Sequence, residues 1–176
     1  RVNRTGVYAA VVGHGNGLSA SSLHLGLSKT GDREMLKTAK RELTNTKLAA
    51  FILPGFATLK DMDMAISEGV DVFQIASHCT EATVTKQYIE YAKKKGKEVY
   101  GVLMMTHMAD ANELRQQAQT MQLYGAAGVF LMDSAGAMND FEANYKVTFL
   151  VENDIPTGFH PHNNLGLAVA NGLHAV

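Results

Sequence analysis

Six short apolar runs recur along the chain, and each is followed by a loop and then by an amphipathic stretch. Near-continuous apolar runs of this length are typical of parallel strands that are buried on both faces. The runs predict strands at Val7–Val12, Leu48–Leu53, Val70–Ala76, Val99–Met104, Gly128–Met132 and Ile155–Phe159. From the second run on, they start at residues 48, 70, 99, 128 and 155, which are 22 to 29 residues apart. That spacing is the length of one βα unit, so the chain is predicted to be an α/β protein with a parallel sheet.

The amphipathic stretches between the runs predict helices. These cover Asp32–Asn45, Leu59–Glu68, Thr83–Lys95, Asn112–Tyr124 and Asp140–Glu152, and another helix begins after Asn164. In the third stretch, Val84, Tyr88 and Ala92 fall on one helical face. Three helices are followed by a glycine at the position where a left-handed residue often ends a helix, namely Gly69, Gly96 and Gly125. Because no linker or change of composition divides the chain, residues 1–176 are expected to form a single domain.

Consecutive βα units fit two architectures, a doubly wound open sheet and part of an eight-unit (β/α)₈ barrel. A doubly wound nucleotide-binding fold calls for the pattern G-x-G-x-x-G after its first strand. The glycine-rich segment Gly13–Gly17 does not match that pattern, because Leu18 occupies the position of the third glycine. This segment is interpreted as a tight loop at the exit of the first strand.

The composition excludes several classes of function. The formal net charge is −1, so no basic surface is expected for nucleic acid or for an anionic membrane. No apolar run approaches the roughly 18 residues of a membrane-spanning helix. The lone cysteine, Cys79, allows no disulfide within the chain, which suits a reducing cytosol. A cytoplasmic enzyme with a small-molecule substrate is the expectation.

His160 and His162 form the most informative short motif. Residues i and i+2 of a strand point to the same face, so these two imidazoles can approach a single point at the end of the last predicted strand. Two converging imidazole nitrogens make half of a metal site. The alternative is a pair of surface histidines in a turn.

Other polar residues also follow the predicted strands, at the end of a parallel sheet where active sites lie. Five of the seven histidines are among them, namely His14, His78, His107, His160 and His162. Cys79 is interpreted as a buried structural thiol. Two roles are possible for Asp133: it is either a metal ligand or a helix cap for the segment that follows it. Ser134 can offer its hydroxyl group to a carboxylate, and the alternative is a plain turn.

Several ordered motifs resemble a known family. The motifs are HGNGLSASS at His14–Ser22, ILPG at Ile52–Gly55, HCTEA at His78–Ala82, GVLMMTHM at Gly101–Met108, DSAGAM at Asp133–Met138 and HPHNNLGLAVAN at His160–Asn171. As an ordered set that covers nearly the whole chain, they resemble the 4-hydroxy-2-oxovalerate aldolases. These are pyruvate aldolases among the metal-dependent lyases related to HMG-CoA lyase, which fold as TIM barrels.

The resemblance implies a partial (β/α)₈ barrel of about six units, strands two to seven, from a lyase of aromatic hydrocarbon catabolism. It implies cleavage of 4-hydroxy-2-oxopentanoate to pyruvate and acetaldehyde with a divalent metal, Mn²⁺ in the usual case. His160 and His162 match two metal ligands of the family, and Ser134 matches its substrate-contacting serine; His160 is also expected to lie beside the substrate. The resemblance also implies an acylating acetaldehyde dehydrogenase as partner.

The chain departs from the family in ways that bear on activity. The family's first-strand segment, which supplies an arginine, a metal-binding aspartate and a histidine base, has no counterpart here, and neither has its last strand. No catalytic residue is therefore expected within the chain. Four positions differ in residue type from the family, namely Val11, Asn16, Gln74 and Asn163. The chain begins with Arg1 rather than Met, so a piece of a longer aldolase is expected. There are two alternatives: a related lyase or synthase that acts on acyl-CoA and 2-oxo acids, and an inactive binding fragment.

Overall fold

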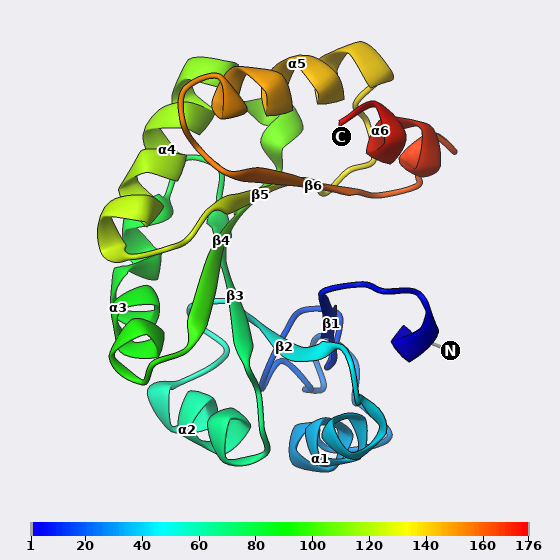
Figure 1. Cartoon of the computed structure of the whole chain (residues 1–176), viewed down its shortest axis with the longest axis vertical. Helices are drawn as coiled ribbons and strands as arrows, with labels where there is room; N and C mark the ends of the chain where they lie inside the picture. Colours follow the sequence, from blue (N-terminus) through cyan, green and yellow to red (C-terminus); the bar gives the residue numbers. More distant parts are fainter. Residues whose placement is uncertain (1, 176) are drawn as a thin grey trace. The chain divides into compact units, whose positions relative to one another are not determined.

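The computed structural model describes residues 2–175, in which strands and helices alternate along the chain (Figure 1). The strands are β1 Ala9–Val11, β2 Lys47–Ile52, β3 Val72–His78, β4 Glu98–Met104, β5 Val129–Asp133 and β6 Thr157–Pro161. The α-helices are α1 Asp32–Glu42, α2 Leu59–Ser67, α3 Lys86–Lys94, α4 Ala111–Tyr124, α5 Asp140–Val151 and α6 Ala168–His174. Short 3₁₀ helices are η1 Val2–Arg4, η2 Ala82–Thr85 and η3 Thr106–Met108.

The strands form one sheet whose order follows the sequence from β1 to β6. Each pair with a defined register is parallel, from Ala9 opposite Lys47 at one edge to Asp133 opposite Pro161 at the other. A doubly wound sheet reverses its strand order at a switch point, whereas a (β/α)₈ barrel adds each strand beside the preceding one. The observed order therefore decides between the two predicted architectures, and the fold is a partial (β/α)₈ barrel.

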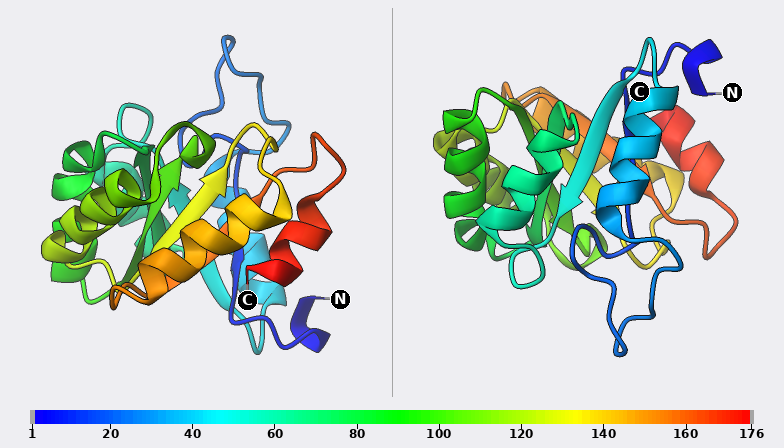
Figure 2. Two further views of the ribbon diagram at one scale, coloured as in Figure 1. Left: turned by 90° about the horizontal axis from the view of Figure 1, so that it is seen from above. Right: turned by 90° about the horizontal axis from the view of Figure 1, so that it is seen from below.

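The chain divides into two compact units, which are described separately. Unit 1 comprises the residues up to Ile75 together with Tyr91–Val99, and unit 2 comprises Ala76–Glu90 together with the residues from Tyr100 onward. In unit 1, α1 packs against β2 and α2. The buried side chains of this unit include Leu36, Leu48, Ile52, Met62 and Phe73. The loop between β1 and α1 projects from this unit in both views of Figure 2.

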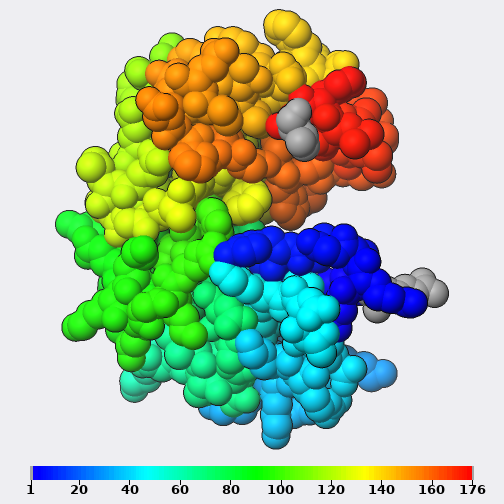
Figure 3. Space-filling view, in the orientation of Figure 1, coloured from blue at the N-terminus to red at the C-terminus, as the bar shows by residue number. Residues whose placement is uncertain are grey.

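Unit 2 contains most of the residues that the sequence singles out for function. Helix α5 packs against α4, α6 and β6, and α6 also contacts β6. In Figure 3 the atoms of α6, in red, lie against those of α5, and the side chain of Asn144 donates a 2.6 Å hydrogen bond to the carbonyl of His174. The buried side chains of this unit include Ile89, Leu114, Met121, Leu131, Met138 and Leu150.

Local signals explain where several helices begin and end. Thr58 and Asp61 form a capping box at the start of α2, and Asn139 and Glu142 form another at the start of α5. The three predicted C-terminal glycines have positive φ, +92° at Gly69, +70° at Gly96 and +113° at Gly125, as expected. Within residues 2–175, no helix is both long and apolar enough to cross a membrane.

The third predicted helix differs from its prediction. It begins with the 3₁₀ turn η2, and the regular helix starts only at Lys86. The shorter period of the 3₁₀ turn rotates the following face, so that Thr85, Ile89 and Ala92 are buried while Val84 is 49% exposed. The predicted face containing Val84 and Tyr88 is therefore wrong at its N-terminal end.

Strand ends also differ from the predicted runs. The first strand is Ala9–Val11 and so is shorter than Val7–Val12; Val7, before the strand, and Val11, at its end, are both about half exposed. In contrast, β3, β5 and β6 extend past their apolar runs to His78, Asp133 and Pro161. Backbone pairing continues there, and for β6 it places His160 opposite Met132. His160 therefore lies within the last strand rather than after it, and His162 is the first residue beyond.

Candidate functional site

His160 and His162 lie side by side at the C-terminal end of β6 in unit 2. Their ring centroids are 5.0 Å apart, and the ring planes are inclined by 36°. An imidazole nitrogen about 2.1 Å from an ion places its ring centroid about 3.2 Å from that ion. Two centroids separated by 5.0 Å then subtend an angle of about 100° at the ion, which is within the range of tetrahedral and octahedral coordination. The spacing of the two rings is thus suited to a shared ion.

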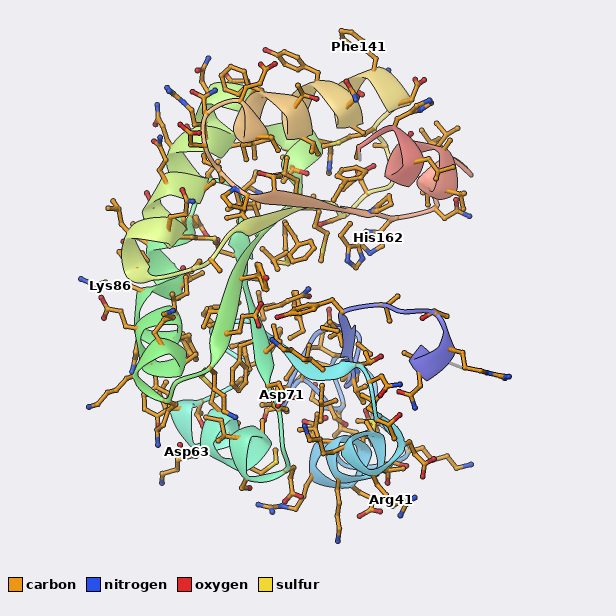
Figure 4. All side chains as sticks on the ribbon, in the orientation of Figure 1. Arg41, Asp63, Asp71, Lys86, Phe141 and His162 are labelled. Carbon is orange, nitrogen blue, oxygen red and sulfur yellow. The ribbon has the colours of Figure 1, made fainter. Side chains whose placement is uncertain are left out.

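A hydrogen bond to the backbone of β5 fixes the orientation of His162. Its Nδ1 lies 2.8 Å from the carbonyl oxygen of Asp133, which also accepts a 3.3 Å hydrogen bond from the His162 backbone N–H. Since a carbonyl oxygen only accepts, Nδ1 must carry the hydrogen. In the neutral ring the free lone pair is then on Nε2, the arrangement that metal-binding histidines usually show. Figure 4 shows His162 on the face of β6 turned away from α5.

The surroundings of His160 favour its neutral form. Although the residue as a whole is exposed, the neighbouring protein partly desolvates its ring, and this desolvation lowers the pKa of His160. The nearby His162 lowers the pKa further, because two positive charges at this distance repel each other. A neutral imidazole is the form that binds a metal.

Asp133 holds together the loop that contains Ser134. Its side chain is fully buried, and its carboxylate accepts hydrogen bonds from the backbone N–H groups of Ala137, at 3.1 Å, and Met138, at 2.9 Å. The open alternatives for Asp133 were a metal ligand and a cap. The structure shows the carboxylate bound to backbone donors of the loop before α5, while Asn139 caps the helix itself, so Asp133 stabilises the loop rather than the start of a helix.

Ser134, predicted as a substrate contact, is half-buried at the start of this loop. Its Oγ accepts a 2.9 Å hydrogen bond from the backbone N–H of Met105. A serine hydroxyl also has one hydrogen to donate. With an acceptor lone pair engaged by Met105, that hydrogen is available to an oxygen atom of a bound molecule.

Gly136 allows the same loop to lie close to the segment after β6. It has φ of +59°, and an added Cβ would lie 2.6 Å from the Asn164 backbone nitrogen and 2.8 Å from the His162 carbonyl oxygen. No side chain fits that space. The glycine therefore brings the backbone beside Ser134 close to the backbone of the histidine segment.

The remaining candidates at strand ends have different surroundings. His78 Nδ1 is 2.8 Å from the Thr80 hydroxyl, and the Cys79 thiol donates to the Met105 carbonyl at 3.4 Å. Burial raises the pKa of Cys79, which supports the predicted structural role. His107 Nδ1 lies 3.7 Å from Asp133 Oδ1 and is buried without a hydrogen-bond partner in the described part of the chain. In unit 1, His14 Nδ1 accepts from the Asn16 backbone N–H.

Within residues 2–175, no three His, Cys, Asp or Glu side chains gather in a way that could hold a metal ion. The predicted gathering of five histidines therefore does not form such a group. The pair His160 and His162 provides two suitable nitrogen donors, but a protein metal site normally has at least three protein ligands. The described residues thus fit part of a metal site and do not complete one.

The four positions that the sequence comparison of motifs leads us to expect as departures from the family are polar or exposed. Val11 is 48% exposed on β1, and Gln74 is half-buried on β3. Asn16 lies in the predicted tight loop, where Gly17 has φ of +90° and a Cβ would meet the Phe51 carbonyl at 2.7 Å. Asn163 accepts a 3.1 Å hydrogen bond from the Ala168 backbone N–H through its side chain, so it stabilises the start of α6.

Two features of unit 2 were missed by sequence reasoning. Met105 has a left-handed backbone, with φ of +59° and ψ of +31°, which no local motif predicts. Lys146 is only 8% exposed. A signal for Lys146 was present, because it falls on the helical face that buries Ala143, Val147 and Leu150.

Comparisons with known proteins agree with this arrangement. The family model described as HMGL-like matches residues 17–176, so the chain belongs to the HMGL-like family. The chain is 47% identical over 167 residues to the 4-hydroxy-2-oxovalerate aldolase of Spirochaeta aurantia and covers 49% of that protein. It is 50% identical over 173 residues to 4-hydroxy-2-oxovalerate aldolase 2 of Salinispora arenicola and covers 50% of that protein. The chain spans about half the length of the curated relatives it matches.

Solved structures with the same fold include the pyruvate carboxylase of Rhizobium etli. Its carboxyl transferase domain superposes with a TM-score of 0.74 at 18% identity, covering 83% of this chain and 28% of that one. The complete multifunctional enzyme superposes with a TM-score of 0.77 at 17% identity, covering 96% of this chain and 18% of that one. At this level of identity the likeness shows the shared fold.

Proposed function

We propose that the chain carries part of the active site of a metal-dependent aldolase that cleaves 4-hydroxy-2-oxopentanoate to pyruvate and acetaldehyde. The observation that carries the proposal is the orientation of His162, whose Nδ1 binds the Asp133 carbonyl and leaves Nε2 free beside His160. The identity of 44–50% to proteins called 4-hydroxy-2-oxovalerate aldolase supports the choice of reaction.

In this proposal His160 and His162 hold a divalent ion, Mn²⁺ in the first instance. When bound, such an ion supplies Lewis-acid stabilisation of the negative charge that develops on a 2-oxo acid. The chain's own part is to present two neutral imidazoles, and His160 also lies against the substrate. Ser134 donates its free hydroxyl hydrogen to an oxygen of the 2-oxo acid and so orients it.

The further metal ligand and the proton-transferring base are proposed to belong to a part of the longer protein outside this chain. We therefore assign no catalytic residue within it. The absence of a three-donor group among residues 2–175 favours the second candidate, that the chain alone is an inactive piece of the aldolase domain. In the full-length protein, both compact units would belong to that one barrel domain.

The wider setting is also part of the proposal. We infer a cytoplasmic enzyme of aromatic hydrocarbon catabolism. Acetaldehyde is a small reactive product, so an acylating acetaldehyde dehydrogenase is the proposed partner. Both inferences rest on the resemblance of the ordered motifs to the aldolase family.

Metal binding tests the ligand assignment. Mn²⁺ titrated into the chain should lose its free-ion electron paramagnetic resonance signal upon binding, and the affinity should be modest because only two protein ligands contribute. His160→Ala and His162→Ala should each abolish that binding. His24→Ala is the matched control, since His24 is an exposed histidine of the β1–α1 loop. Binding that survives both site substitutions would contradict the assignment.

A coupled assay for pyruvate release separates the active enzyme from the inactive piece. With Mn²⁺ and 4-hydroxy-2-oxopentanoate, the chain alone is expected to show no appreciable turnover, since we assign no base within it and residues 2–175 provide no complete ligand set. Turnover that disappears in the His160→Ala variant would show instead that the chain carries its own base and third ligand.

A further inference from the structure

Lys146 is a buried charged residue that the proposed chemistry does not use. It is 8% exposed and projects from the core-facing side of α5. Lysine is rarely buried to this degree unless its ammonium group has a partner. Here Nζ donates a 2.9 Å hydrogen bond to the backbone carbonyl of Thr106, which is a neutral acceptor rather than a carboxylate. A lysine in this position is costly to bury, and its contact therefore calls for an explanation.

The acceptor belongs to a turn with an unfavourable backbone. Met105, which follows β4, has a left-handed conformation, with φ of +59° and ψ of +31°. Such a conformation is unfavourable for a non-glycine residue and persists only where neighbouring groups impose it. Two groups hold Met105 directly, the Ser134 Oγ that accepts from its N–H at 2.9 Å and the Cys79 thiol that donates to its carbonyl at 3.4 Å.

Two more contacts hold the next residue of the turn. The Thr106 hydroxyl donates to the Met132 carbonyl at 2.9 Å, and the Thr106 carbonyl accepts from Lys146. Both side chains are buried, so water does not replace either bond. Lys146 is the charged donor among the contacts to this turn, and hydrogen bonds from charged donors are stronger than those between neutral groups.

The Met105–Thr106 turn fixes the orientation of Ser134. Because the Met105 N–H occupies a lone pair of Ser134 Oγ, the position of that N–H determines where the hydroxyl hydrogen can point. We propose that Lys146 is a positioning residue, which clamps the Met105–Thr106 turn and thereby aims the Ser134 hydroxyl at a carboxylate or keto oxygen of the bound 2-oxo acid. The role in substrate orientation rests on the proposed function, whereas the clamp itself does not.

Amide hydrogen exchange of the wild-type chain and of Lys146→Met tests the clamp. Methionine keeps the length of the side chain and removes the donor. The Met105 amide should exchange about tenfold faster in Lys146→Met, beyond any change at the Leu131 amide in the core of unit 2, since one hydrogen bond to a charged group is lost. Lys86→Met is the control, because Lys86 has a side chain that is 58% exposed. Equal changes at Met105 and Leu131 would overturn the proposal.

A measurement on the wild-type chain keeps the proposal open to refutation if Lys146→Met does not fold. Lysine ¹⁵N NMR should show one ammonium group with slowly exchanging hydrogens and a correlation to the Thr106 carbonyl. Failure to observe a protected lysine ammonium in the folded chain would contradict the clamp.

Pyruvate binding then distinguishes the clamp from the proposed function. With Mg²⁺ as a diamagnetic ion, pyruvate should shift the Ser134 amide resonance of the wild-type chain, and Lys146→Met should weaken this response as Ser134→Ala does. A wild-type chain whose Ser134 resonance ignores pyruvate would count against the proposed function, while the exchange rates would still decide the clamp. A full response in Lys146→Met would overturn the positioning role.

Discussion

Two groups of charged residues in this molecule differ in burial. In unit 1, the first residues of β2 and β4 meet: Lys47 lies 2.7 Å from Glu98, whose carboxylate also accepts a 2.6 Å hydrogen bond from Tyr8. We call this the strand-start cluster. In unit 2, buried Asp133 and Lys146 hold the loops that follow β5 and β4. We call this the strand-end network.

The two arrangements use charge in different ways. The strand-start cluster pairs opposite charges at a surface, where Glu98 and Tyr8 raise the pKa of Lys47 but water and salt screen the attraction. The strand-end network pairs charged side chains with backbone groups in the interior, where a missing hydrogen bond lowers stability strongly. In barrels of this kind, the starts of the strands serve stability and the ends carry chemistry. The burial of the strand-end network suits a role in positioning the loops that follow β4 and β5.

The largest expected effect on stability belongs to Asp133. Replacing it with alanine should lower the free energy of unfolding by about 3 kcal/mol, because two backbone N–H groups lose a charged acceptor in the interior. Urea denaturation followed by circular dichroism measures this change. Asn171→Ala is a useful comparison, since it removes a single neutral bond to the Met138 carbonyl and should cost less. Equal losses of unfolding free energy in both variants would show that the Asp133 carboxylate stabilises the chain no more than the Asn171 side chain does.

Lys146 should make the stability of the chain depend on pH. Burial lowers the pKa of Lys146 in the folded chain below its ordinary value of 10.5. Between those two pKa values the unfolded chain binds more protons, so stability should rise with pH in that interval. Lys146→Met should lose this rise, whereas titrations of other groups remain in both chains. Urea midpoints from about pH 7 to about pH 10 provide the measurement, and parallel curves for the two chains would contradict the prediction.

The smallest effect should come from the strand-start cluster. Glu98→Ala breaks the contacts to Lys47 and Tyr8, but exposed ion pairs contribute little to stability. Its denaturation midpoint should lie close to that of the wild-type chain, and any difference should shrink at high salt. A loss as large as that of Asp133→Ala would erase the contrast between the two arrangements.

Local patterns in the sequence predicted the succession of strands and helices, and the spacing of His160 and His162 predicted that their rings lie together. These properties depend on neighbours within a few residues. The contact from His162 to the Asp133 carbonyl joins residues 29 apart, and that from Lys146 to Thr106 joins residues 40 apart. No periodicity encodes such pairings, because they arise only when the βα units pack. The sequence alone therefore could not predict the hydrogen bonds that orient the candidate residues, although it did single out His160 and His162 as candidate ligands.

The central claim is that His160 and His162 share one divalent ion, with His162 oriented by Asp133. Crystals of the chain soaked in Mn²⁺ and measured near the manganese absorption edge test it directly. We predict one anomalous peak about 2.1 Å from His162 Nε2 and from a ring nitrogen of His160, with His162 Nδ1 still bound to the Asp133 carbonyl. A peak bound through His162 Nδ1, or by only one of the two histidines, would contradict the claim.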